Sequence, residues 1–196
     1  MKDFFNRYSY NIIKLFIHQF AISIFGAMLS FVAVSTNNDG VTIALSACSI
    51  AFYLFLIYTL IWEVGATDKI SVDVGKRPYR PMTGLYMALV ANIPNFLVAI
   101  IFTIARPLAQ TYAWATGVVG VLRVLSAVPL HGMYNGMMMV LPLGADTVKL
   151  YDFWWVYFLL TVPSLIACFM AYYLGHKNFR FYALFLPKKK EENKKK

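Results

Sequence analysis

Two asparagines flank a proline in the middle of an uncharged stretch of 24 residues, 82–105. Pro94 has no amide hydrogen, so the carbonyl of Val90, four residues earlier, loses its helical donor. The carboxamides of Asn92 and Asn95 would lie near the middle of a bilayer, where polar groups are costly. Broken helices with free carbonyls form solute and ion sites in many transporters. The pattern predicts a site for a small solute, and the alternative is a kink whose polar groups are satisfied by neighbouring helices.

A second set of polar residues lies where the first two apolar stretches meet water. Lys14 and His18 are one helical turn apart and therefore share one face of a helix. Glu63, at the end of the next stretch, reaches a similar depth if the two helices run antiparallel. These three residues predict a proton or cation relay. The alternative is a lysine that extends to the interface and a histidine that is hydrogen-bonded inside the bundle.

A third set, Arg123, His131 and Asn135, lies in an apolar region that prolines and glycines interrupt. Arg123 could hold an anionic ligand in an outward-facing pocket, or it could reach the lipid headgroups. Three consecutive methionines, 137–139, follow. We interpret them as flexible packing rather than Cu(I) ligands, because consecutive residues face different directions on a helix. No metal site is predicted.

The one long charged interruption between the first and last apolar stretches is residues 63–81. Its cations Lys76, Arg77 and Arg80 predict binding to anionic lipid headgroups. Asp68 and Asp73 lie in the same connector, five residues apart, and this spacing matches no metal-binding motif.

Motifs that would indicate an enzyme do not occur. The chain has no HExxH pair, no GxSxG elbow, no P-loop and no acidic pair within an apolar stretch. We therefore expect a protein without catalytic activity and without a cofactor. Chemistry on lipid headgroups at the connector is the remaining alternative.

The composition explains where these residues must lie. The 196 residues are 60% hydrophobic and 14% charged, with a mean hydropathy of +0.60, whereas soluble domains carry about 25% charged residues. The net charge is +9, but the cations flank apolar stretches or form a terminal lysine run. No nucleic-acid-binding motif accompanies them, so anionic lipid is the expected partner and nucleic acid is not.

The apolar stretches predict an all-α integral membrane protein. Residues 15–35, 41–62, 82–105 and 153–174 are each long enough to span, since about 20 residues cross the hydrocarbon core. Residues 107–146 are apolar but broken, and we expect them to form a membrane-embedded segment that re-enters or lies at the interface. The alternative is six spans.

Charge asymmetry predicts the orientation. Three of the 18 lysines and arginines precede Leu15, four lie in residues 63–81 and eight follow Leu174. Basic residues in short loops mark the cytoplasmic side, so both termini are expected in the cytoplasm and the protein in the cell membrane. Residues 1–14 then form an interfacial lead-in, 15–181 a single membrane domain and 182–196 a basic disordered tail.

The connector itself has two interpretations. Ile70, Val72 and Val74 alternate with polar residues, which is typical of a short strand. Alternatively, Pro78 and Pro81 keep it an extended, solvated link.

These features together predict a multi-pass protein that binds or transports a small solute. We expect it to act as a subunit of a larger transporter or as a homo-oligomer. The alternative function is a membrane scaffold or assembly factor that recruits partners through its basic connector and tail.

Overall fold

The computed structural model describes residues 2–142 and 149–179. This part of the chain is 84% helical and has no strand, and four or five of its helices are long and apolar enough to span a membrane. The prediction of a helical protein with several membrane-spanning segments is confirmed at this level. The predicted tail, 182–196, lies outside the described residues.

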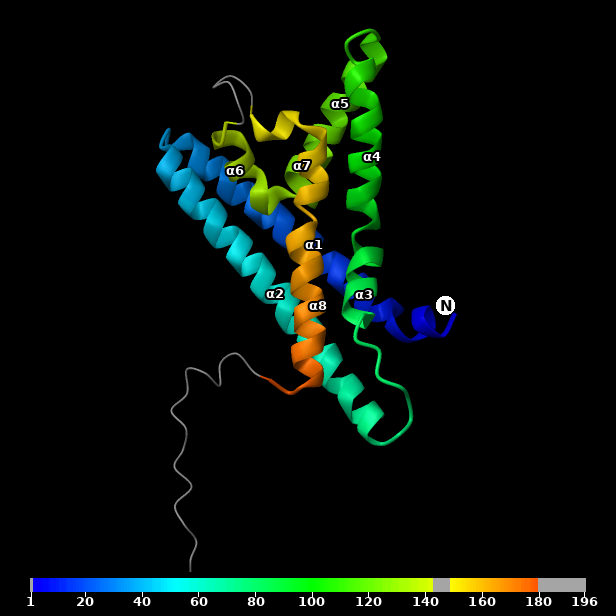
Figure 1. The fold of residues 1–196 in the computed structure, drawn as a ribbon. Coiled ribbons are helices and arrows are strands. Elements are labelled where there is room, and N and C mark those ends of the chain that lie inside the picture. The colour runs from blue at the N-terminus through cyan, green and yellow to red at the C-terminus, as the bar shows by residue number, and fades with distance from the viewer. Residues whose placement is uncertain (1, 143–148, 180–196) are drawn as a thin grey trace, which may run out of the picture.

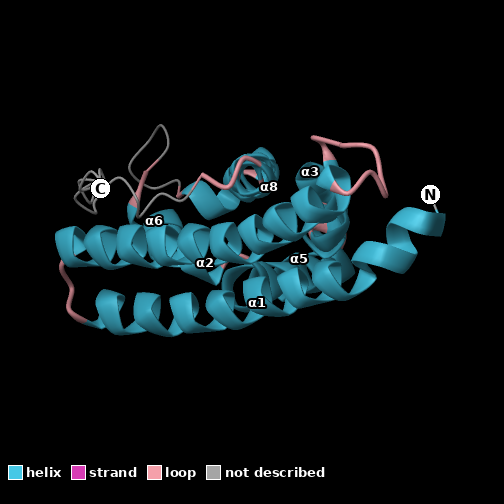
Figure 2. Cartoon of the chain, turned by 90° about the horizontal axis from the view of Figure 1, so that it is seen from below, coloured by secondary structure: helices cyan, strands magenta, loops and turns pink. Residues whose placement is uncertain are grey.

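Two long antiparallel helices, α1 (Lys2–Ser35) and α2 (Asp39–Asp73), form one layer of the bundle (Figure 2). Three residues, 36–38, join them, and the Asn38 side chain caps α2 by accepting a hydrogen bond from the Val41 amide at 3.2 Å. The predicted lead-in, 1–14, is not a separate element, because all of it that is described belongs to α1.

The predicted connector begins too early and contains no strand. Helix α2 continues through Asp73, so only residues 74–82 form a loop. Residues 70–73 instead continue α2, whose buried face in the preceding turns includes Leu60, Ile61, Gly65 and Asp68. We call the end of the bundle that holds loop 74–82 the basic end; Figure 1 shows it at the bottom.

The third apolar stretch is broken. Helix α3 (Thr83–Ala91) and helix α4 (Ile93–Leu108) meet at Asn92 with a bend of 53°. Pro94 occupies the first turn of α4, where its missing amide hydrogen is tolerated. The proline therefore produces a break two residues before itself rather than a kink at its own position.

Residues 107–142 form a helical hairpin rather than one straight element. The chain turns after α4, runs back as α5 (Ala113–Leu125), and then passes through a π-helical turn, η1 (Ser126–Leu130), and a short turn, η2 (Gly132–Tyr134). Helix α6 (Asn135–Val140) returns along α1 and α2 toward the end opposite the basic end (Figure 1).

Serine side chains of α1 hold the irregular backbone of this hairpin. The Ser23 hydroxyl accepts from the Gly132 amide at 2.6 Å and donates to the Val128 carbonyl at 2.9 Å. The Ser30 hydroxyl accepts from the Gly136 amide at 3.0 Å. Backbone groups that leave a helix inside an apolar region need such partners, so these serines allow the turn to lie deep in the bundle.

We expect Gly132→Ala to destabilise the protein by about 1–3 kcal/mol. A Cβ at this position would overlap the backbone carbonyl of Ser23, and neither main chain can move without breaking the serine contacts. The measurement is thermal unfolding in detergent. Gly117→Ala is the matched control, because nothing lies within 4 Å of a Cβ there, and its stability should be unchanged or slightly raised.

The last apolar stretch consists of η3 (Leu150–Asp152), α7 (Trp154–Leu159) and α8 (Val162–His176), with a short interruption at 160–161. Helix α8 packs closely on α2. A Cβ on Gly65 would meet the backbone of Tyr172, and one on Gly175 would meet the backbone of Trp62. These two glycines bring α2 and α8 together at the basic end.

Candidate functional site

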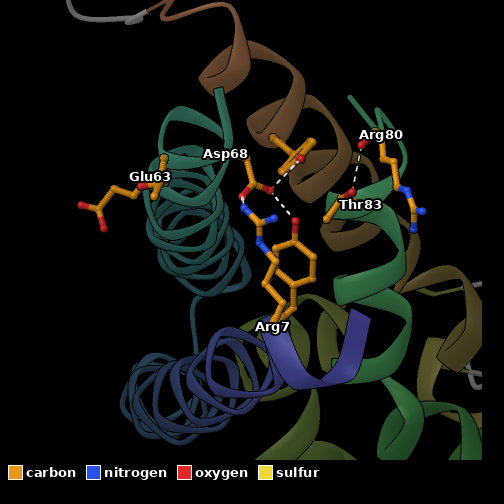
Figure 3. Close-up of polar contacts among 8 residues, drawn as sticks. Arg7, Glu63, Asp68, Arg80 and Thr83 are labelled. Atoms are coloured by element: carbon orange, nitrogen blue, oxygen red, sulfur yellow. Dashed lines mark hydrogen bonds and ion pairs between the residues drawn. The ribbon is translucent and has the colours of Figure 1, made fainter. Parts of the chain in front are cut away.

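A buried aspartate lies at the basic end, where α1, α2 and α8 meet (Figure 3). Asp68 is 5% exposed. One carboxylate oxygen forms an ion pair with the guanidinium of Arg7. The other accepts hydrogen bonds from the hydroxyls of Tyr8 at 2.5 Å and Tyr172 at 2.8 Å. Three helices that are distant in sequence therefore share one carboxylate.

The partners of Asp68 explain why a charge is tolerated at this depth. An unpaired buried carboxylate costs several kcal/mol, and pairing with an arginine plus two hydroxyl donors offsets that cost. The Arg7 side chain is 22% exposed and that of Asp68 7%, so the pair lies at the boundary between the bundle interior and water.

Close backbone packing positions this cluster. Gly65 is nearly one turn before Asp68 on α2 and contacts the main chain of Tyr172. On α3, a Cβ at Gly84 would approach the Cys168 carbonyl and the Tyr172 Cβ at 2.5 Å each. The absence of side chains at these positions lets Tyr172 reach the carboxylate.

A pocket of about 540 Å³ opens beside the cluster. It is lined by α1, the end of α2, the loop and the start of α3, including Arg7, Arg77, Arg80 and Thr83. The Thr83 hydroxyl donates to the Arg80 carbonyl at 2.8 Å, which fixes the junction between loop and helix. The volume is within the range of small-molecule sites.

The three residues predicted to bind lipid headgroups divide into two groups. Arg77 and Arg80 line this pocket, whereas Lys76 does not. All three residues are exposed, and no salt bridge of theirs occurs within residues 2–142 and 149–179. Neither arginine of the pocket wall therefore has a carboxylate partner among the described residues.

The predicted relay residues meet only in part. Lys14 and Glu63 both line a smaller pocket of about 260 Å³ on the other side of Arg7 and Asp68, but the described residues include no ion pair between them. Glu63 is exposed, and Figure 3 shows it pointing away from Asp68. His18 contacts the Lys14 carbonyl at 2.7 Å through Nδ1. These contacts do not form a continuous relay.

The predicted solute-site residues at the α3–α4 break form a buried hydrogen-bond network. The Asn95 amide donates to the Asn92 carboxamide oxygen at 2.7 Å, and the Asn92 amide donates to the Ala88 carbonyl at 2.8 Å. The Asn92 amide also contacts Ser164 on α8 at 3.4 Å. The asparagines thus tie the broken helix to α8, and neither of the two pockets described above includes them.

A further buried hydrogen bond lies in the centre of the bundle. The Gln19 amide on α1 donates to the Tyr53 hydroxyl on α2 at 3.2 Å. All of these side chains are at least nine-tenths buried. An apolar layer separates the network from the Asp68 cluster; its fully buried members include Leu15, Ile57, Ile61 and Met87.

No hydrogen bond or ion pair joins Arg123, His131 and Asn135, the third predicted set, in the described structure. Arg123 pairs with Asp152 at 2.6 Å, while His131 contacts the Ser126 hydroxyl at 3.0 Å through Nδ1. The amide nitrogen of Asn135 and Nε2 of His131 are buried and lack a hydrogen-bond partner in the described structure. The arginine and the histidine therefore have separate partners.

Comparison with protein-family models, curated proteins and solved structures finds no match to this chain.

The Asp68 cluster was not predicted from the sequence. Asp68 was considered only with Asp73, which the structure leaves exposed on another face of α2. Arg7 and Tyr8 precede Asp68 by about 60 residues, and Tyr172 follows it by 104. One feature of the sequence did indicate the pair. Asp68 follows an apolar stretch and lies opposite Arg7 if the first two helices are antiparallel, which favours an ion pair between them.

Proposed function

We propose that this protein binds a small anionic solute in the pocket beside Asp68. One observation carries the proposal: three arginines, Arg7, Arg77 and Arg80, line a pocket of about 540 Å³ at the basic end. Arginine is well suited to carboxylate and phosphate because its planar fork donates two parallel hydrogen bonds.

The charge balance of the pocket supports an anion. Its acidic residues are Asp3 and Asp68, and Arg7 offsets Asp68 through their ion pair. Asp3 offsets one further charge, which leaves a net charge of one cation on the pocket wall. A ligand with a single phosphate or carboxylate would complete the pairing of Arg77 and Arg80.

We further propose that the solute crosses the membrane through the bundle. The broken helix at Asn92 and the buried hydrogen bonds among Asn95, Asn92 and Ser164 support a path from the pocket, since discontinuous helices near mid-depth are a common feature of transporters. The apolar layer between pocket and network would act as the closed gate of this conformation.

The proposed threading has four spans, with residues 107–146 re-entrant and both termini in the cytoplasm. The return of α6 along α1 and α2 supports it. We expect cysteines at positions 76 and 190 to react with an impermeant maleimide from the same side of the membrane, in a background with Cys48 replaced by serine. Reaction from opposite sides would contradict the threading.

Uptake tests the transport proposal. We expect Asn92→Leu combined with Asn95→Leu to abolish uptake of labelled phosphate into proteoliposomes. The double variant loses the hydrogen bond from Asn95 to Asn92 and the one from Asn92 to Ser164. Phosphate binding by the same variant should persist, since the asparagines do not line the pocket. Uptake equal to the wild type would remove the α3–α4 break from the path, and loss of insertion is checked by the yield in membranes.

The second candidate function is recruitment of partners by the basic end. Residues 74–82 are all exposed, and Lys76 lies outside the pocket. Neutralising Lys76 and deleting residues 191–196 should then remove partners while leaving anion binding intact. Under the solute-binding proposal, anion binding is lost only when Arg77 and Arg80 are replaced.

A further inference from the structure

Two arginines share one carboxylate at the end of the bundle opposite the basic end. Arg106 lies in the last turn of α4, Arg123 in the last turn of α5 and Asp152 in η3. One oxygen of Asp152 accepts from Arg123 at 2.6 Å and from Arg106 at 3.2 Å. Figure 1 shows the far end of α4 and the start of α7 at the top, away from loop 74–82.

The cluster has a surplus positive charge in a partly buried place. The side chains of both arginines are 37% exposed and that of Asp152 is 21% exposed. No other salt bridge to these three residues occurs in the described chain. A surplus charge at the edge of an apolar bundle is costly unless a counter-ion binds it.

Arg123 also has an unused donor. Its Nε is buried and has no hydrogen-bond partner among the described residues. The guanidinium carbon lies 5.4 Å from the centre of the Tyr151 ring, and the Tyr157 hydroxyl donates to the Tyr151 carbonyl at 2.9 Å. The guanidinium is therefore within cation–π range of the ring, and of the Arg123 nitrogens only Nη2 contacts Asp152.

We infer that Arg106 and Arg123 form a second anion site, which binds one phosphate or carboxylate group. The anion would accept from guanidinium nitrogens of Arg106 and Arg123 that Asp152 does not occupy, since both side chains are 37% exposed, while Asp152 holds the two guanidiniums together. This chemistry is supplied equally by a soluble anion and by the phosphate of an anionic lipid. The inference does not depend on the proposed function, because the two sites lie at opposite ends of the bundle and share no residue.

Calorimetric titration of inorganic phosphate tests the site. The full chain is placed in nanodiscs of phosphatidylcholine alone, and the number of bound phosphates is compared between variants. We expect two per wild-type chain, one for Arg123→Gln and one for Arg77→Gln with Arg80→Gln. Arg123→Lys keeps the charge but removes the planar fork of donors, so it should weaken the second site roughly tenfold.

A second arm distinguishes the source of the anion. Native mass spectrometry counts the phosphatidylglycerol molecules that each variant retains from mixed nanodiscs. Loss of one retained lipid in Arg123→Gln, with unchanged phosphate binding, supports the site with lipid as its ligand. Thermal unfolding shows that each variant is folded, and Arg123→Lys replaces Arg123→Gln if the latter is not.

The possible failures are separable. If Arg123→Gln and Arg123→Lys match the wild type in both phosphate stoichiometry and lipid retention, the second site is overturned. If phosphate binding depends on Arg123 but not on Arg77 and Arg80, the second site stands and the proposed function fails.

Discussion

Replacing Asp68 with asparagine is expected to destabilise the protein by about 3 kcal/mol, or roughly 10 °C in melting temperature. The substitution leaves Arg7, whose side chain is 22% exposed, without its counter-ion. It also turns a carboxylate oxygen that accepts from both Tyr8 and Tyr172 into a neutral group. The loss of stability is measured by heating the protein in detergent and determining the fraction that remains monodisperse at each temperature.

Two further variants separate the ion pair from the simple removal of a charge. Asp73→Asn changes an exposed acid five residues later on the same helix and should leave stability unchanged. Arg7→Met combined with Asp68→Leu removes both charges and should recover part of the stability, because apolar replacements of a whole buried pair are often tolerated. Equal melting of Asp68→Asn and the wild type would show that the cluster does not hold the three helices together.

Replacing Arg77 and Arg80 together with glutamine is expected to weaken phosphate binding by about 2 kcal/mol, roughly thirty-fold. Each arginine is expected to contribute only about 1 kcal/mol to the free energy of phosphate binding, because both side chains are exposed and water competes for them. Phosphate titration of the protein in phosphatidylcholine nanodiscs gives the two affinities.

Lys76→Gln is the matched control for this pair. It removes a cation from the same loop but not from the pocket wall, so a specific site should keep its affinity. Added salt should weaken binding in the wild type more than in the double variant, because exposed charges are screened over about 10 Å at 0.1 M. Equal losses for Lys76→Gln and the double variant would indicate general attraction to the basic end rather than a site.

The length of the apolar stretches predicted the helical membrane class, because length alone decides whether a helix can span. Predictions from local sequence patterns failed where tertiary packing decides the structure. The end of α2 looked polar and strand-like, yet residues 70–73 continue a helix whose preceding turns pack against α8 through Gly65 and Asp68. Likewise, Pro94 predicted a disturbance in the third stretch, but the break lies at Asn92 because proline fits the first turn of a new helix.

The candidate site was predictable only in its cations. Arg77 and Arg80 were identified from their position in a basic connector, but as headgroup ligands rather than as a pocket wall. The partnership of Asp68 with Arg7, Tyr8 and Tyr172 joins three helices across 60 to 104 residues, and no local pattern encodes such a contact. For the same reason Asp152 was not recognised as the partner of Arg123.

The most direct test of the central claim is ligand protection of a cysteine inside the pocket. Val72 lines the pocket and Lys76 does not. In a Cys48→Ser background, the maleimide labelling rate of Val72→Cys should fall several-fold at saturating phosphate, sulfate or succinate, while that of Lys76→Cys stays constant. Labelling of Val72→Cys at one unchanged rate, with and without each of the three anions, would contradict the assignment of this pocket as an anion site.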